Sequence, residues 1–435
     1  MKNLTMIKNV ALISLGCDKN RVDAENMLYY LCGKDLTVVN NYAEADAIIV
    51  NTCAFIESAR KEAIDTILEM AEYKKGRCKK LIVTGCLSEK YRSELVPALP
   101  EVDVFLGVNE YEKIYAAITG DESAICPVSE CKRVLSTPAH YAFLKISDGC
   151  NNHCTFCTIP SIRGKYKSRT IESLTEELTD LASRGVKEII LVAQDVTNYG
   201  KDLYGQPSLV KLLASLEKTD IEYIRLMYCY PELVTDELID YIASSKKVLH
   251  YLDIPLQHVD DSVLKRMGRR SSYSSICELF DRLKAKIPDI SIRTTMMVGF
   301  PGETEEQFEK LCDFVLKYKP DHLGVFAYSR EEGTPSYKMD GQLTKKIKKQ
   351  RVDKLGKINL VNTEERNRSL VGKTVKVIYE DIDYDRNVFV GRMLSDAPDI
   401  DSRVYFTGSF VDVGKVYDVR ITGFNKYDLT GELVE

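Results

Sequence analysis

Apolar and polar residues alternate in three different ways along the chain, and each pattern predicts a different architecture. Up to about Arg133, short β-branched apolar runs alternate with longer amphipathic stretches such as Ser58–Lys75. Three of the short runs end in a cysteine: VALISLGC (Val10–Cys17), AIIVNTC (Ala47–Cys53) and KLIVTGC (Lys80–Cys86). Strands that alternate with helices in this way predict a doubly wound parallel sheet with helices on both faces.

From about Pro138 to Leu370, strand-like runs are separated by amphipathic helical stretches such as IESLTEELTDLASRG. Six β/α units predict a partial TIM-like barrel, (β/α)6, rather than a full barrel of eight. In barrels of this kind the working residues lie in the loops that follow the strands. The expected strands are Tyr141–Ser147, Glu188–Ala193, Tyr223–Tyr228, Val248–Ile254, Ser291–Val298 and His322–Tyr328.

After residue 370 the pattern changes to five short strands separated by Gly and Asp turns. This predicts a small antiparallel β-barrel, similar in size to an OB-fold. A basic helical stretch, Lys345–Leu370, joins it to the preceding region, and its simplest interpretation is a solvated helix face. We therefore expect three domains, at residues 1–133, 138–370 and 371–435.

Composition narrows the class of protein. The chain has 435 residues, of which 44% are hydrophobic and 29% charged, as in a soluble globular protein of two to four domains. No apolar run approaches the roughly 18 residues of a membrane span, and the N-terminal run is too short for a secretory signal, so a cytoplasmic location is predicted. Thirteen cysteines then favour metal binding or catalysis over disulfides. The net charge of −5 argues against a general nucleic-acid binder.

The three cysteines at strand ends are candidate ligands. In open α/β sheets, ligands bind outside the carboxyl ends of the strands, so Cys17, Cys53 and Cys86 can converge on one rim. The spacings of 36 and 33 residues each correspond to one strand–helix unit. Any one of them alone would be read as a buried core thiol. Three at equivalent positions favour a shared site.

A second cysteine group, CNNHCTFC (Cys150–Cys157), follows the first expected barrel strand with the spacing C-x3-C-x2-C. Thiolates suit zinc, copper(I) or iron–sulfur clusters, but zinc and cubane clusters usually take four protein ligands. If Cys150, Cys154 and Cys157 hold a 4Fe-4S cluster, one iron stays open to chelate S-adenosylmethionine (SAM), whose cleavage yields a 5′-deoxyadenosyl radical. A zinc ribbon or incidental cysteines are the alternatives, although His153 is awkwardly placed for a fourth zinc ligand.

Over nearly its whole length the sequence resembles the methylthiotransferase family of radical-SAM enzymes. Both cysteine triads carry this resemblance, together with Phe156, the aromatic residue that precedes Cys157. The resemblance implies an N-terminal domain whose triad, Cys17, Cys53 and Cys86, binds a second 4Fe-4S cluster, followed by a radical-SAM barrel and a small C-terminal barrel called TRAM. The open iron of the second cluster would hold the sulfur to be transferred.

The stretch SLGCDKNRVDAE (Ser14–Glu25) resembles one branch of that family, which typically reads SLGCPKNxVDSE. It departs at Asp18 and Ala24, and Thr430 stands where Trp is common. This branch implies methylthiolation of an aspartate β-carbon in small-subunit ribosomal protein S-twelve, with two SAM molecules and an electron donor per turnover. A tRNA adenosine methylthiotransferase and a non-enzymatic ribosome-binding metal protein remain alternatives. Three further stretches resemble the same branch: Tyr251–Arg269, Val298–Phe308 and Gly391–Asp401.

Charge gives a separate indication of the partner. Residues 371–435 contain 8 Lys and Arg against 12 Asp and Glu, a net charge of −4. An acidic barrel suits a basic protein partner, whereas phosphate binding would require a basic surface. The basic segment Lys345–Lys349 keeps tRNA open as the alternative. Six aspartates are expected at two turns of the barrel: Asp381, Asp383, Asp385, Asp396, Asp399 and Asp401.

Four residues in loops after the second, fourth and fifth barrel strands are candidate SAM contacts: Gln194, Gln257, Gly299 and Gly302. The family resemblance favours this role, and glycines permit close backbone approach to a ligand. Ordinary turn geometry is the alternative for each. The remaining cysteines share no spacing and are interpreted as packing or surface thiols: Cys32, Cys78, Cys126, Cys131, Cys229, Cys277 and Cys312.

Overall fold

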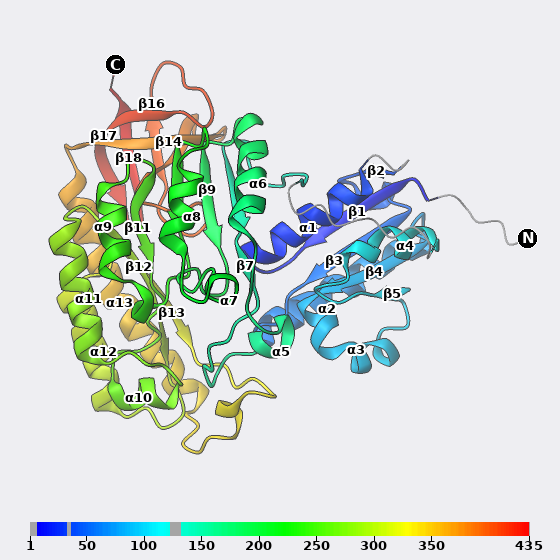
Figure 1. The fold of residues 1–435 in the computed structure, drawn as a ribbon, viewed down its shortest axis with the longest axis horizontal. Helices are drawn as coiled ribbons and strands as arrows, with labels where there is room; N and C mark the ends of the chain where they lie inside the picture. The colour runs from blue at the N-terminus through cyan, green and yellow to red at the C-terminus, as the bar shows by residue number, and fades with distance from the viewer. Residues whose placement is uncertain (1–6, 33–35, 122–131, 435) are drawn as a thin grey trace, which may run out of the picture.

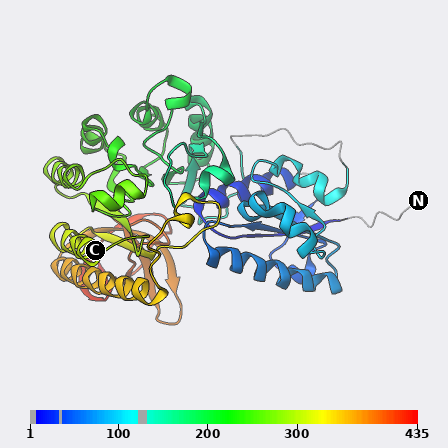
Figure 2. The ribbon, with the colours of Figure 1, turned by 90° about the horizontal axis from the view of Figure 1, so that it is seen from below.

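The computed structural model describes residues 7–32, 36–121 and 132–434, which form three main β-sheets in two lobes (Figure 1). The N-terminal sheet and its helices form one lobe. The six-stranded sheet and the closed C-terminal barrel form the other (Figure 1). The lobes meet along α1 (Asp18–Leu31), which packs on β6 (Tyr141–Lys145), and along α3 (Cys86–Ala98), which packs on α5 (Ile159–Arg163) (Figure 2).

The N-terminal sheet is parallel, with strand order β2-β1-β3-β4-β5. Helices cover both of its faces: α1 and α4 pack on one side, α2 and α3 on the other. Every residue of β3 is buried as a result, which explains its continuous apolar run. The doubly wound prediction is confirmed. The further elements are β1 (Asn9–Ser14), β2 (Thr37–Val38), β3 (Ala47–Thr52), β4 (Lys80–Gly85), β5 (Val104–Phe105), α2 (Glu57–Glu72) and α4 (Ile114–Thr119).

The second sheet has six parallel strands in the order β13-β12-β11-β10-β9-β6 and does not close, as expected of a partial barrel. Its outer face and the surrounding helices form the largest apolar core of the described residues. The strands are β9 (Glu188–Val192), β10 (Tyr223–Leu226), β11 (Val248–Asp253), β12 (Ser291–Val298) and β13 (His322–Ala327), besides β6. The outer helices are α6 (Ile171–Ser183), α8 (Leu209–Leu216), α9 (Asp236–Ser244), α10 (Asp261–Arg266), α11 (Tyr273–Lys286) and α12 (Glu305–Tyr318).

The C-terminal strands form a closed barrel in the order β14-β15-β16-β18-β17. The prediction of a purely antiparallel barrel is wrong for one pair, because β16 and β18 are parallel. The chain between these two strands crosses to β17, so β18 enters the gap in the same direction as β16. The long helix α13 (Lys345–Leu370) packs on β13, and the chain then continues into the first strand of the barrel. The strands are β14 (Thr374–Asp383), β15 (Val388–Met393), β16 (Val404–Thr407), β17 (Val416–Asn425) and β18 (Asp428–Leu433).

Two of the six aspartates expected on the acidic barrel surface are instead buried against the six-stranded sheet. The Asp396 carboxylate lies 3.0 Å from His322, and Asp401 lies 3.2 Å from the other ring nitrogen of the same histidine and forms an ion pair with Arg293. Both aspartate side chains have no exposed surface. They anchor the barrel to the sheet, a role that sequence pattern could not distinguish from a solvated turn.

Among the described ranges, no helix is long and apolar enough to cross a membrane.

Candidate metal centres

The three predicted cysteines of the N-terminal sheet lie at the carboxyl ends of neighbouring strands. Cys17 follows β1 and caps α1, Cys53 follows β3, and Cys86 begins α3 after β4. The strand order reverses between β1 and β3, which is where open α/β sheets bind ligands. Gly16 has φ +96°, and a Cβ there would lie 2.8 Å from the Cβ of Cys53. A side chain at this position would force the two loops apart.

These three residues, named here the N-terminal triad, form a gradient of burial from exposed Cys17 through half-buried Cys53 to buried Cys86. Burial raises the pKa of Cys53, and it raises the pKa of Cys86 to about 12. The neighbouring Cys17 thiol adds to the rise at both positions, while the Arg163 guanidinium opposes it. The thiols therefore share one electrostatic environment, and metal binding there must release their protons.

The second set, Cys150, Cys154 and Cys157, is named here the barrel triad. It lies in the loop between the short strands β7 (Ser147–Asp148) and β8 (Lys167–Ser168), at the carboxyl edge of the six-stranded sheet. All three thiols are half-buried. Burial raises the pKa of Cys150 to about 11 and that of Cys157 to about 12.

Backbone contacts hold the barrel-triad loop in place. The Thr155 N–H donates to the Met267 carbonyl at 2.9 Å. Gly268 has φ +72°, and a Cβ there would lie 2.5 Å from the carbonyl oxygen of His153. The missing side chain therefore permits the close packing that fixes the loop from behind.

Two residues beside the barrel triad were not predicted from the sequence. The Tyr230 hydroxyl lies 2.6 Å from the Cys154 sulfur, and the Arg269 guanidinium lies 3.8 Å from the same sulfur. The guanidinium also lies 3.9 Å from the centre of the Tyr230 ring. Arg269 falls inside the stretch that resembles the family, which was the available signal. Tyr230 follows β10 and had no sequence signal.

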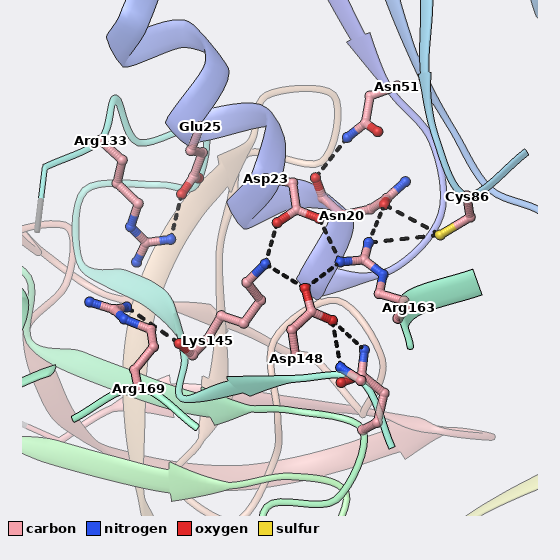
Figure 3. A network of polar contacts seen from close by, with 12 residues as sticks. Asn20, Asp23, Glu25, Asn51, Cys86, Arg133, Lys145, Asp148, Arg163 and Arg169 are labelled. Carbon is pink, nitrogen blue, oxygen red and sulfur yellow. Dashed lines mark hydrogen bonds and ion pairs between the residues drawn. The ribbon is translucent and has the colours of Figure 1, made fainter. Parts of the chain in front are cut away.

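A buried ionic network joins the two lobes between the triads (Figure 3). Arg163 pairs with Asp23 at 2.8 Å and with Asp148 at 2.9 Å, and Lys145 pairs with the same two carboxylates. Although burial opposes ionisation, Lys145 and Arg163 hold the pKa of Asp148 well below its usual range. Two cations and two carboxylates balance, so the network is neutral as a whole.

The same network reaches both triads. Arg163 donates to the Asn20 side chain at 2.8 Å and lies 3.7 Å from the sulfur of Cys86 (Figure 3). At the other end, Asp148 stands two residues before Cys150 in the sequence. Arg163 therefore ties a residue of the N-terminal triad to the base of the barrel-triad loop.

We expect Arg163→Met to lower the free energy of unfolding by about 3–5 kcal/mol, because removing one partner of a buried ion network leaves uncompensated charges. Denaturant unfolding of the full chain measures this. The matched control is Arg282→Met, whose ion pair with Asp236 is exposed and should contribute at most about 1 kcal/mol. Equal effects at the two positions would show that the network is not stabilising.

Buried cations indicate what the triads can hold. Seven Lys and Arg side chains are buried in the described ranges, and five of them form ion pairs with carboxylates. The two that do not are Lys19, two residues after Cys17, and Arg269, beside Cys154. A buried cation requires a compensating anion. A cluster held by three thiolates is anionic, so the barrel triad beside Arg269 suits such a group.

The glutamines among the predicted SAM contacts lie in the expected loops. Gln194 donates its amide to Asp148 at 3.2 Å, and its buried carbonyl oxygen has no hydrogen-bond partner in the described structure. Gln257 has φ 71° and pairs through its backbone with β12 at Met296. The free acceptor of Gln194 is available to a ligand.

The two predicted glycines have close protein neighbours. A Cβ on Gly299 would lie 2.5 Å from a side-chain carbon of Lys348, and the Gly302 N–H donates to the Gly341 carbonyl at 2.8 Å. These contacts favour turn geometry and packing. A contact with SAM at either glycine stays a prediction.

The other cysteines are placed as packing or surface thiols: Cys78, Cys229 and Cys312 are buried, Cys277 is half-buried and Cys32 is exposed, while Cys126 and Cys131 lie outside the described residues.

Within the described ranges, no three His, Cys, Asp or Glu side chains are grouped to hold a single metal ion. A zinc ion holds its sulfurs at about 2.3 Å. A cluster of several irons occupies more space between its ligands.

Comparison with known families divides the chain into three matched segments. Residues 144–315 match the Radical SAM superfamily, and residues 371–434 match the TRAM domain. Residues 9–107 match a family described as "Uncharacterized protein family UPF0004". The matched segments follow the three sheets.

Several curated relatives align over almost the whole chain. The chain is 47% identical to "Ribosomal protein uS12 methylthiotransferase RimO" of Clostridium tetani, over 98% of each sequence. It is 46% identical to the protein of the same name from Acetivibrio thermocellus, over 99% of each.

Solved structures share the fold at low identity. The radical SAM methyltransferase TsrM from Kitasatospora setae superposes with a TM-score of 0.56 at 16% identity, covering 76% of this chain and 77% of TsrM. The cobalamin-dependent radical enzyme OxsB gives a TM-score of 0.52 at 13% identity, covering 82% of this chain and 56% of OxsB. These likenesses support the arrangement of the sheets.

Proposed function

This chain belongs to the ribosomal protein uS12 methylthiotransferase family, and from that membership we propose that it replaces a hydrogen on the β-carbon of a uS12 aspartate with a methylthio group. One observation supports the chemistry most directly. Two separate cysteine triads are joined by one buried network, and the barrel triad has beside it a buried cation, Arg269, that forms no ion pair within 4.0 Å in the described residues. Such a pair of sites suits a reaction that needs both a radical and a source of sulfur.

We assign one 4Fe-4S cluster to each triad. When bound, the barrel-triad cluster supplies the electron that cleaves SAM to a radical, and the N-terminal cluster supplies an open iron for the sulfur. The chain's own residues shape these sites: Tyr230 and Arg269 cover Cys154, and Arg163 approaches Cys86. The Gln194 carbonyl oxygen is a suitable acceptor for SAM.

Two SAM molecules serve each turnover, one as methyl donor and one as radical source, and an external donor supplies the electron. We place the N-terminal cluster in residues 1–133, radical generation in residues 138–370 and substrate docking in residues 371–435. The cytoplasm, where ribosomal proteins are made, is the proposed location.

The test is mass spectrometry of ribosomal proteins and tRNA from a strain that lacks this chain. We expect uS12 to lose a methylthio group at one aspartate while tRNA nucleosides stay unchanged. If tRNA adenosines in that strain lacked their methylthio group while uS12 still carried its own, the tRNA alternative would replace this proposal.

The accessible aspartates of the closed barrel are the proposed contact surface for basic uS12. Asp381, Asp383 and Asp399 line a cavity of about 340 Å³ between the barrel and the six-stranded sheet, and Tyr141 forms part of its wall. Asp385 lies on the adjoining turn and is exposed. Of the six aspartates predicted from the sequence, Asp396 and Asp401 have buried side chains and these four remain accessible to a partner, with Asp383 half-buried.

Replacing these four accessible aspartates with Asn should raise the KM for uS12 about tenfold or more at low ionic strength, because opposite charge mainly accelerates association. The KM of the unchanged enzyme should rise with added salt, and that of the variant should respond less. Steady-state kinetics over a salt series measures both. SAM binding should not change.

The matched control removes four exposed acidic residues from α2 on the other lobe: Glu62, Asp65, Glu69 and Glu72. Neutralising these residues should leave the KM for uS12 unaltered. If the two sets of substitutions had the same effect, net charge rather than the barrel surface would govern the encounter.

A further inference from the structure

Lys19 carries a buried ammonium group with no carboxylate within 4.0 Å among the described residues, although it interacts at longer range with the buried carboxylate of Asp253. It lies in the first turn of α1, and the residue is only 7% exposed. Its Nζ lies 3.4 Å from the centre of the Tyr228 ring, yet it forms none of the ion pairs found within 4.0 Å in the described structure. The ring compensates part of the charge, as cation–π contacts do. A buried ammonium is stabilised further by an anion.

The Tyr228 ring beneath this ammonium lies between the two triads. Its hydroxyl donates to Asp18, the neighbour of Cys17, at 3.1 Å. Two residues further along, the Tyr230 hydroxyl reaches Cys154 at 2.6 Å, and two residues span at most about 7 Å of chain. One short segment after β10 therefore contacts both sites, with Lys19 on its N-terminal-triad side.

The Tyr228 backbone is held firmly in this position. Its φ is 57°, an unusual value for a bulky residue, and its N–H donates to the carboxylate of buried Asp253 at 3.0 Å. The platform under Lys19 is thus set by the end of β11. A rigid platform keeps the ammonium in place before any ligand arrives.

We propose that Lys19 binds the carboxylate of the substrate aspartate and thereby holds its β-carbon between the two triads. This rests on the function proposed above. The β-carbon is bonded directly to the carboxylate carbon, so fixing the carboxylate restricts the C–H group to a small volume. A charge-assisted hydrogen bond from an ammonium also selects aspartate over neutral side chains of similar shape.

The experiment compares uS12 with a form in which the modified aspartate is Asn. Equilibrium binding of each to the full, anaerobically reconstituted chain is measured by fluorescence anisotropy. Lys19→Met should weaken binding of the aspartate form roughly tenfold to a hundredfold, since a bond to a charged group is lost. It should leave binding of the Asn form unchanged. Lys19→Arg should keep part of the preference for aspartate.

Lys211→Met, at an exposed position on the outer helix α8, is the matched control and should bind both forms normally. Equal weakening of both uS12 forms by Lys19→Met would overturn the assignment. So would a shift in the reduction potential of the N-terminal cluster with the aspartate preference intact, because Lys19 would then serve an anion on the cluster.

If the Lys19→Met variant fails to retain iron, the Lys19→Arg variant provides the test. A preference of Lys19→Arg for the aspartate form of uS12 would support the assignment, and complete loss of that preference would overturn it. Failure of the unchanged enzyme to bind uS12 at all would remove the proposed function together with this assignment. Binding of uS12 without any preference for aspartate over Asn would remove only the role of Lys19.

Discussion

Alanine at all three positions of the barrel triad is expected to lower the iron bound after anaerobic reconstitution from about eight to about four atoms per chain. It should also abolish cleavage of SAM, because the remaining cluster would lie in the other lobe. The thiols of Cys150, Cys154 and Cys157 are the candidate ligands on that loop, and the Thr155 contact with Met267 that helps to hold it does not depend on their sulfurs. Iron and sulfide assays, with chromatography of 5′-deoxyadenosine, measure both effects.

The control is alanine at three cysteines outside the triads, Cys78, Cys277 and Cys312. Their iron content should match that of the unchanged chain. Loss of all iron from the barrel-triad variant, or of none, would contradict the assignment of two independent clusters.

Alanine at Cys53 is expected to eliminate the methylthio product while leaving SAM cleavage in place. Cys53 lies at the centre of the N-terminal triad, against Gly16, so its loss removes one of the three proposed ligands of the cluster to which we assign the sulfur. The radical-generating site keeps all of its residues. Parallel measurement of 5′-deoxyadenosine and of modified uS12 separates the two steps.

Cys32→Ala tests whether any thiol change in this lobe has the same effect, because Cys32 is exposed at the end of α1 and belongs to neither triad. It should give normal product. Full methylthio product from Cys53→Ala would remove the N-terminal triad from the sulfur-transfer step.

The sheets were predictable because their patterns are strong and local. Runs such as Ala47–Thr52 are buried on both faces and remain apolar throughout, and β12 begins and ends where the run Ser291–Val298 indicates. The parallel pairing of β16 with β18 was not predictable, because it depends on the path between strands rather than on any residue pattern.

The cysteine ligand candidates were also accessible from spacing, whereas the residues around them were not. Arg163, Lys145 and Tyr230 act through contacts with residues distant in the sequence, such as Asp23 and Cys154. The sequence alone does not distinguish a buried charged side chain from an exposed one. The same limit explains why Asp396 and Asp401 were expected on the surface.

The buried ionic network between the lobes constrains how the enzyme can move. Pulling α1 away from β6 and α5 would separate Asp23 from both Lys145 and Arg163, and these charged side chains would lose their ion-pair partners. An outward swing of the N-terminal lobe between turnovers would break this network, so we expect the two lobes to stay docked during the reaction. Ligands would then have to reach either triad while the two lobes remain in contact.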